Sequence, residues 1–221
     1  MRSLTAETQD SRTLEDLGLA SIQIVHDLKN QLNGFKLYAT FLRRRMETSE
    51  RPADELEVID KLIAGIERTA AELTILVRYG RPISITARPD VRLSVILSSL
   101  RNQEVGGEDV RLDVDDDSIR GEYDIVALTE ALQSITNGAL TMLKTSDTLL
   151  IRQCRNDETP NSHVLIEWRN VETGERDVFR SLAGADALRL ALAAKIVEAH
   201  GGTAVQQPGL LRVSLPVQVC D

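Results

Sequence analysis

Aromatic residues make up only 3% of this sequence, and it contains only two cysteines, Cys154 and Cys220. Two cysteines are too few for a disulfide framework, so we expect a reduced, cytoplasmic setting. Because Trp, Tyr and Phe are so scarce, the core has to be built mainly from Leu, Ile, Val and Ala.

The chain also lacks a hydrophobic run long enough to span a membrane, and residues 1–12 lack the apolar segment of a signal peptide. A formal net charge of −8 argues against nucleic acid as the main partner. The overall composition of the 221 residues, 42% hydrophobic and 27% charged, is ordinary for a globular protein. This length allows one large domain or two small ones.

A long amphipathic pattern follows the polar leader at residues 1–12 and predicts a helix over residues 13–48. His26 lies two residues from both Ile24 and Leu28, so at about 100° per residue it points about 160° away from the apolar stripe. Asn30, Lys29 and Asn33 share that outer face. The stripe consists of Leu17, Ile24, Leu28, Leu32, Phe35, Ala39, Leu42 and Met46.

A second helix is predicted from Pro52 to the break at residues 80–82, because apolar residues alternate at spacings of three and four along it. Two antiparallel helices cannot bury such stripes on all sides alone. We therefore expect the hairpin to pair with a second copy in a homodimeric four-helix bundle. The second stripe consists of Leu56, Ile59, Ile63, Ile66, Ala70, Leu73 and Val77.

Strands and helices alternate after residue 82, which predicts an α+β sandwich with helices on one face of a mixed sheet. We expect strands at residues 83–85, 110–114, 148–154, 163–169, 203–206 and 210–217. Helices are expected at residues 91–103, 123–144 and 185–200.

The sequence around His26, with Asp27 beside it and Asn30 one turn on, resembles the H-box of bacterial two-component histidine kinases. Two later stretches, residues 128–139 and 195–202, resemble the ATP-binding domain of the same family. After the flexible leader expected at 1–12, the resemblance implies a dimerisation and phosphotransfer hairpin at 13–81 and a Bergerat-type α/β sandwich at 82–221.

The same resemblance implies roles for individual residues. His26 would be the phosphoacceptor, a role that suits neutral imidazole, which is a nucleophile near pH 7. Asp27 would polarise the other ring nitrogen, and Asn30 would position a water that removes phosphate from a partner. A receiver domain of a response regulator would dock near Lys29, Asn33 and Lys36.

Three nucleotide-binding boxes depart from the family pattern. Ser134 and Gly138 stand where the family has two asparagines on one face of a helix. Asn137 is one residue away from the second of these positions, so it is expected about 100° from that face of the helix. The adenine box, at residues 170–174, lacks its carboxylate and first glycine. The glycine-rich box before the last helix, at residues 185–189, carries side chains in place of glycines. We therefore expect no bound ATP or metal, with magnesium supplied by the receiver.

The sequence thus predicts a phosphorelay histidine phosphotransferase that passes phosphoryl groups between receiver aspartates through His26. Three alternatives stay open. The chain could be an ATP-dependent kinase with divergent boxes, a phosphatase or scaffold that binds a response regulator, or a helical interaction module in which His26 is an ordinary surface residue.

Overall fold

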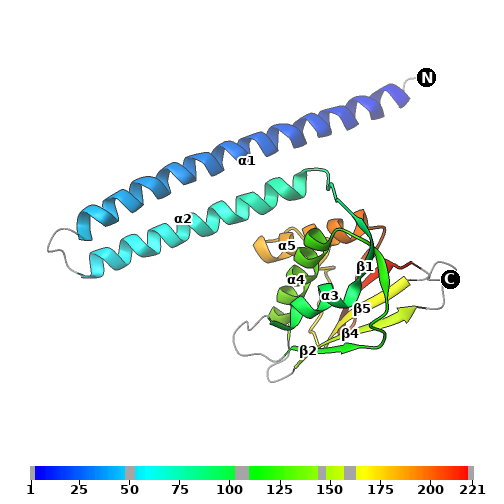
Figure 1. Cartoon of the computed structure of the whole chain (residues 1–221). Helices are drawn as coiled ribbons and strands as arrows, with labels where there is room; N and C mark the ends of the chain where they lie inside the picture. Colours follow the sequence, from blue (N-terminus) through cyan, green and yellow to red (C-terminus); the bar gives the residue numbers. More distant parts are fainter. Residues whose placement is uncertain (1–2, 48–52, 103–109, 144–147, 157–162, 219–221) are drawn as a thin grey trace. The chain divides into compact units, whose positions relative to one another are not determined.

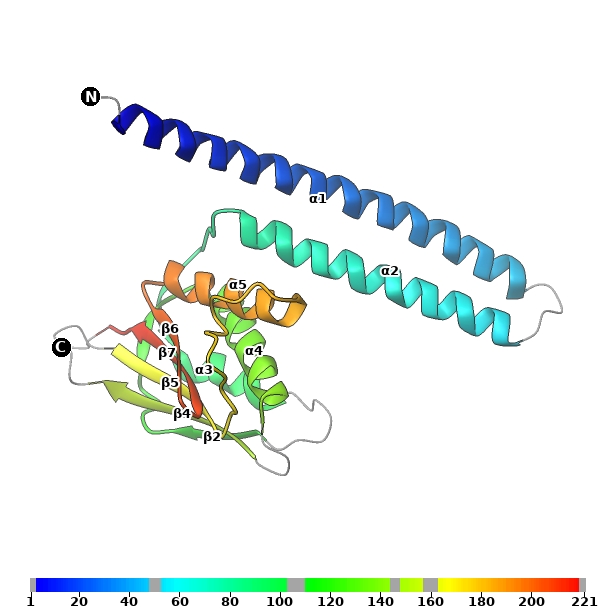
Figure 2. The same cartoon turned by 180° about the vertical axis from the view of Figure 1, so that it is seen from behind.

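The computed structural model describes residues 3–47, 53–102, 110–143, 148–156 and 163–218. The chain forms two compact units, Met1–Arg81 and Pro82–Asp221 (Figures 1 and 2). None of the helices in the described ranges is long and apolar enough to cross a membrane. The elements in chain order are α1 (Ser3–Glu47), α2 (Ala53–Gly80), β1 (Arg88–Arg92), α3 (Leu93–Ser98), the 3₁₀ helix η1 (Ser99–Asn102), β2 (Val110–Val114), β3 (Arg120–Tyr123), α4 (Ile125–Thr141), β4 (Leu149–Asn156), β5 (His163–Arg169), α5 (Ala185–Ala199), β6 (Thr203–Gln207) and β7 (Leu210–Pro216).

The first unit is a hairpin of two long helices lying side by side (Figure 1). The predicted stripe of α2 faces α1, and its residues, which include the buried Val77, are all half-buried or buried. Close packing extends to the end of α2, where a Cβ on Gly80 would lie 2.8 Å from Ile22 of α1. Ion pairs also tie the helices together, since Arg43 lies 2.7 Å from Asp60. The hairpin therefore has an apolar interior with charged edges.

The second unit is built on a five-stranded sheet in the order β2-β4-β5-β7-β6. β2 pairs with β4 in parallel, whereas the other neighbouring strands are antiparallel. Helices α3, α4 and α5 cover one face of this sheet (Figure 2). The core lies between these layers, where the fully buried Trp168 donates a hydrogen bond of 2.9 Å to the hydroxyl of Thr136 on α4. This arrangement confirms the predicted α+β sandwich.

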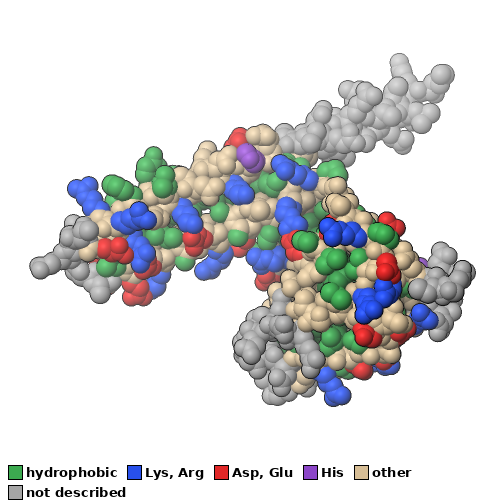
Figure 3. Space-filling model, viewed as in Figure 1, with side chains coloured by type: hydrophobic (Ala, Val, Ile, Leu, Met, Phe, Trp, Pro, Cys, Tyr) green, Lys and Arg blue, Asp and Glu red, His purple; other side chains and the backbone are tan. Residues whose placement is uncertain are grey.

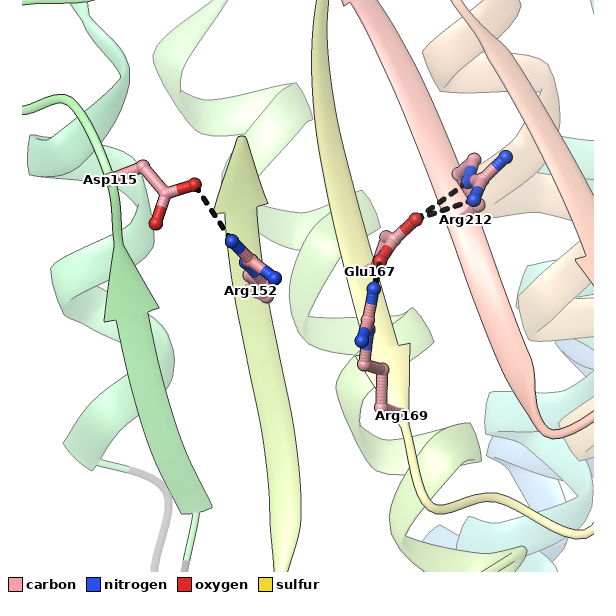
Figure 4. Close-up of polar contacts among 5 residues, drawn as sticks. All are labelled: Asp115, Arg152, Glu167, Arg169 and Arg212. Carbon is pink, nitrogen blue, oxygen red and sulfur yellow. Dashed lines mark hydrogen bonds and ion pairs between the residues drawn. The ribbon is translucent and has the colours of Figure 1, made fainter. Parts of the chain in front are cut away.

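The other face of the sheet carries a row of charges across β4, β5 and β7, with Arg152, Glu167 and Arg212 in register (Figure 4). The Glu167 side chain is only 3% exposed and is bound by Arg212 at 2.6 Å and by Arg169. Burial alone would raise the pKa of Glu167, but the hydrogen bonds and charges of the two arginines outweigh burial and leave that pKa below its usual value.

Several sequence expectations need correction. Helix α1 begins at Ser3 rather than at Thr13. Residues 83–85 form no strand; instead β1 pairs with β3 in a separate two-stranded sheet, and α3 begins only at Leu93. Short strands with mixed polarity such as β1 (Arg-Pro-Asp-Val-Arg) carry little periodic signal. Cys220 and the expected helix end at residue 103 lie outside the described residues.

Candidate functional site

His26 lies near the middle of α1, and its side chain is 48% exposed. This exposure agrees with the prediction that the imidazole lies on the open face of its helix. One other histidine, His200, is placed differently. His200 is buried, with Nδ1 bonded to the Ile196 carbonyl at 2.8 Å and Nε2 accepting the Asp124 N–H at 3.1 Å. Both ring nitrogens of His200 thus serve the fold.

Two neighbouring side chains, those of Asn30 and Asp27, approach Nδ1 of the His26 ring. The Asn30 amide nitrogen lies 3.3 Å from Nδ1, and Asp27 Oδ1 lies 3.6 Å from it. Gln23, one turn before Asp27, donates a hydrogen bond of 3.1 Å to the same carboxylate oxygen. The helix therefore brings the three predicted catalytic residues together, and it adds Gln23, which sequence reasoning missed although its spacing of four from Asp27 is a usual helix contact.

The three predicted partner-binding residues do not form one open face. Lys36 is bound to Glu67 of α2 at 2.7 Å, and Lys29 is half-buried. Both lie about 60–80° from His26 around the helix, whereas Asn33 is exposed and lies within about 20° of it. Of the three, only Asn33 is both exposed and within about 20° of the imidazole.

The predicted apolar stripe of α1 divides between two faces. Ala39 is buried and Leu32 half-buried, as expected for the hairpin interior. Met46 is also half-buried, and the side chain of Leu17 lies outside what the structure describes. The four exposed members of the stripe form what we call the open seam, which lies about 160–200° around the helix from His26. Hydrophobic side chains reach the surface of the hairpin in Figure 3. The open seam consists of Ile24, Leu28, Phe35 and Leu42, which are 61%, 45%, 57% and 52% exposed.

An apolar groove of about 360 Å³ opens between α1 and α2 beside the open seam. Phe35 and Leu42 belong to both features, and Leu62 contributes from α2 although it is itself exposed. The remaining lining residues are Tyr38, Ala39, Ile59 and Ile66. Such a surface on a lone hairpin leaves large apolar side chains in contact with water.

Two further large apolar side chains, Leu37 and Phe41, are 70% and 63% exposed and do not belong to the open seam. They follow His26 by eleven and fifteen residues, which places them about 20° and 60° from it around the helix and about 16 and 22 Å along it. The sequence analysis missed them because they fall outside the periodic stripe. They extend the side of α1 that carries His26.

In the second unit, a small pocket of about 170 Å³ lies where the nucleotide boxes were expected, between α4 and the start of α5. Arg189 lies 2.6 Å from Asp186 there, at the position of a family glycine. The prediction that Asn137 turns away from this place is wrong, because Asn137 lines the pocket together with Ser134 and Gly138. Gly138 allows close helix packing, since a Cβ there would lie 2.7 Å from Leu190.

Asn170 occupies the position of the family's adenine-binding carboxylate. It follows β5 with a φ of 72°, and its amide nitrogen donates a hydrogen bond of 3.0 Å to the Thr148 carbonyl. Asparagine tolerates this left-handed conformation better than most residues. The side chain is therefore engaged in a turn, and the loop after it is held to the β6–β7 hairpin because Thr173 donates to the Gln207 carbonyl at 3.1 Å.

No protein-family model matches this sequence, and no curated protein sequence is similar to it. Solved structures do match. The crystal structure of full-length ShkA in complex with AMPPNP has a TM-score of 0.70 at 14% identity, covering 90% of this chain and 45% of that one. The Acinetobacter baumannii histidine kinase AdeS has a TM-score of 0.54 at 14% identity, covering 86% and 95%. The chain thus has the histidine kinase fold and spans less than half of the ShkA chain.

Proposed function

We propose that this chain is a histidine phosphotransferase of two-component signalling, in which His26 takes a phosphoryl group from one receiver-domain aspartate and passes it to another. The observation that carries the proposal is the exposed His26 ring, flanked at Nδ1 by Asp27 and Asn30, on a histidine kinase fold. With Nδ1 facing its neighbours on the helix, Nε2 is the nitrogen left for phosphorus.

The transfer is an in-line displacement at phosphorus. The Nε2 lone pair forms the N–P bond while the bond from phosphorus to the aspartyl oxygen breaks, and the aspartate leaves as a carboxylate. The ring then carries a positive charge with its proton on Nδ1, and Asp27 stabilises that charge. Magnesium and its carboxylates belong to the receiver. The helix contributes positioning, which is worth several kcal/mol in well-oriented reactions.

The residues where the family binds nucleotide, between α4 and the start of α5, do not fit ATP, so no step of this mechanism uses ATP. Small-molecule sites usually measure roughly 300–1,000 Å³, whereas the pocket beside Arg189 has about 170 Å³. The Arg189–Asp186 pair stands where the family's backbone approaches phosphate, and the Asn170 amide is bonded to a carbonyl. These three features support a phosphoryl group that comes from a partner protein.

A second copy of the hairpin is the proposed occupant of the open seam and the groove. The seam is apolar and continuous with the α1–α2 interior. A second hairpin that packs along it would contribute the other two helices of a four-helix bundle. It lies on the opposite side of α1 from His26, so pairing through Phe35 and Leu42 leaves both imidazoles accessible. The homodimer is therefore compatible with phosphoryl transfer at two sites.

The partner docks, in this proposal, on the side of α1 that carries His26. We define this His26 face as Asn33, Leu37 and Phe41 together with His26 and Asn30. A globular domain whose aspartate reaches Nε2 would cover the next three to four turns of α1, about 16–22 Å. Leu37 and Phe41 give that domain an apolar anchor, which Lys29 and Lys36 border with positive charge.

The direct test offers the purified chain a set of receiver domains that carry labelled phosphoryl groups. We expect label to move onto the chain and from there to a second receiver, and we expect His26→Asn to abolish both steps. A scaffold would bind receivers without acquiring label, and a kinase would acquire label from Mg-ATP alone. A matched control is Glu57→Gln, an exposed change on α2 that should leave the transfer rate unchanged.

A further inference from the structure

The Nδ1 atom of His26 faces two groups that make opposite demands on it. The amide nitrogen of Asn30, 3.3 Å away, is a hydrogen-bond donor only, so it requires an unprotonated Nδ1. The carboxylate of Asp27, with Oδ1 at 3.6 Å, is an acceptor only, so it requires a proton on Nδ1. The two contacts cannot be hydrogen bonds to the same neutral ring at the same time.

These demands select different tautomers of the neutral imidazole, which carries one proton. When Asn30 donates to Nδ1, the proton lies on Nε2, and Nε2 has no lone pair to offer phosphorus. When Asp27 accepts from Nδ1–H, Nε2 is unprotonated and nucleophilic. The partner of Nδ1 therefore decides whether His26 can take a phosphoryl group.

The resting geometry favours the unreactive tautomer. The distance of 3.3 Å to Asn30 is close to hydrogen-bond range, whereas 3.6 Å to Asp27 is outside it. Gln23 donates to Asp27 Oδ1 at 3.1 Å, and this is the oxygen that lies 3.6 Å from Nδ1. Gln23 thus holds the activating carboxylate while Asn30 occupies the ring nitrogen.

We propose that Asn30 and Gln23 are positioning residues that keep resting His26 in the Nε2–H tautomer, and that the docked partner releases it. An acceptor oxygen of the incoming phosphoryl group takes the Asn30 amide hydrogens. Nε2 then loses its proton to solvent, Nδ1 gains one from solvent, and Asp27 accepts the new Nδ1–H. This inference rests on the proposed function and adds a restraint on when His26 reacts.

The first test needs no partner. Long-range proton–nitrogen NMR spectra of the protein alone give the chemical shifts of the His26 ring nitrogens, and these shifts report which nitrogen carries the proton. We expect mostly Nε2–H in the wild type. Asn30→Ala should raise the Nδ1–H fraction, and Asn30→Asp, which leaves only an acceptor, should raise it further. Gln23→Ala should act in the same direction by freeing Asp27, and Glu57→Gln should have no effect.

Single-turnover transfer from a phosphorylated receiver supplies the second readout, measured before hydrolysis of phosphohistidine matters. We expect Asn30→Ala to speed phosphoryl uptake by roughly two- to tenfold, the worth of one exposed hydrogen bond. An Asn30→Ala protein with a smaller Nδ1–H fraction and slower uptake would overturn the inference, because the amide oxygen would then be the group facing the ring. If no variant takes label but the tautomer responds as described, the proposed function fails and the restraint on His26 stands.

Discussion

The ammonium of Lys36 lies 2.7 Å from the carboxylate of Glu67, which joins α1 to α2 on the edge of the hairpin. Each side chain is about half exposed, so the pair contributes little more than ~0.5 kcal/mol to stability. It does engage the lysine that sequence reasoning assigned to partner binding. Docking is therefore expected to depend more on the apolar part of the His26 face than on this charge.

Leu37→Ala and Phe41→Ala test this docking surface. Each removes a large apolar side chain that a partner would bury, and burial of such a side chain is worth about 1.5–3 kcal/mol. We expect each change to weaken receiver binding by at least about tenfold in calorimetric titrations. Lys61→Ala, an exposed change on α2, should leave the affinity unchanged. An affinity that survives both apolar changes but falls steeply with added salt would instead indicate docking through Lys29 and Lys36.

Phe35→Glu tests the homodimer. Phe35 lies in the open seam, and a carboxylate there would be desolvated between two copies without a partner. We expect light scattering to give the mass of one chain for this variant and of two chains for the wild type. Leu37→Glu is the matched control, because the same change about 160° further around α1 should leave the dimer intact. A wild-type chain that scatters as a monomer would contradict the bundle.

Glu167→Gln tests the charged row on the open face of the sheet. The change leaves Arg169 and Arg212 without their carboxylate, so we expect the free energy of unfolding to fall by about 2 kcal/mol. Urea unfolding can be followed by fluorescence of Trp168, the one tryptophan of the chain, which is fully buried in this unit. Asp113→Asn, at an exposed position paired with Arg152 across β2 and β4, should change stability by less than about 0.5 kcal/mol.

The lowered pKa of Glu167 also predicts how stability depends on pH. Because the carboxylate is favoured in the folded state, the unfolded state binds protons more readily, and its glutamate pKa is about 4.3. The contribution of Glu167 is complete above that value and is lost as pH falls through the lower folded pKa. Urea titrations at pH 7 and at decreasing acidic pH should show this loss in the wild type and a smaller one in Glu167→Gln. Equal acid sensitivity in both would contradict the assignment.

Mg-ATP is expected to leave the melting temperature of this chain unchanged. A ligand that binds only the folded state stabilises it by RT ln(1 + L/Kd), where L is the free ligand concentration. The pocket beside Arg189 offers only about 170 Å³ to such a ligand. Differential scanning calorimetry with and without millimolar Mg-ATP measures this directly. A clear rise in melting temperature that Arg189→Glu abolishes would show that the site still binds nucleotide.

The sequence was sufficient where a pattern extended over many residues. The seam of α2 has seven apolar positions at heptad spacing, and all of them are buried or half-buried. The same reasoning placed His26 on the outside, because the opposite face of its helix is apolar. The two-stranded β1–β3 sheet gave no such pattern, since five and four residues of mixed polarity are too short for periodicity to decide.

The remaining errors come from side-chain contacts that one sequence does not reveal. The α1 stripe reads as one face, yet only the fold separates Ala39, which faces α2, from Phe35, which is open. Asn137 was assigned by counting residues along a helix, but it lines the same pocket as Asp186 and Arg189 of α5. Gln23 needs a defined rotamer to reach Asp27.

The central claim is that His26 accepts a phosphoryl group from a receiver and not from ATP. Intact-protein mass spectrometry after separate incubations with phosphorylated receivers and with Mg-ATP tests it most directly. We predict a mass gain of one phosphoryl group per chain with at least one receiver, no gain with Mg-ATP, and no gain in His26→Asn. A gain from Mg-ATP alone, or one that persists in His26→Asn, would contradict the account.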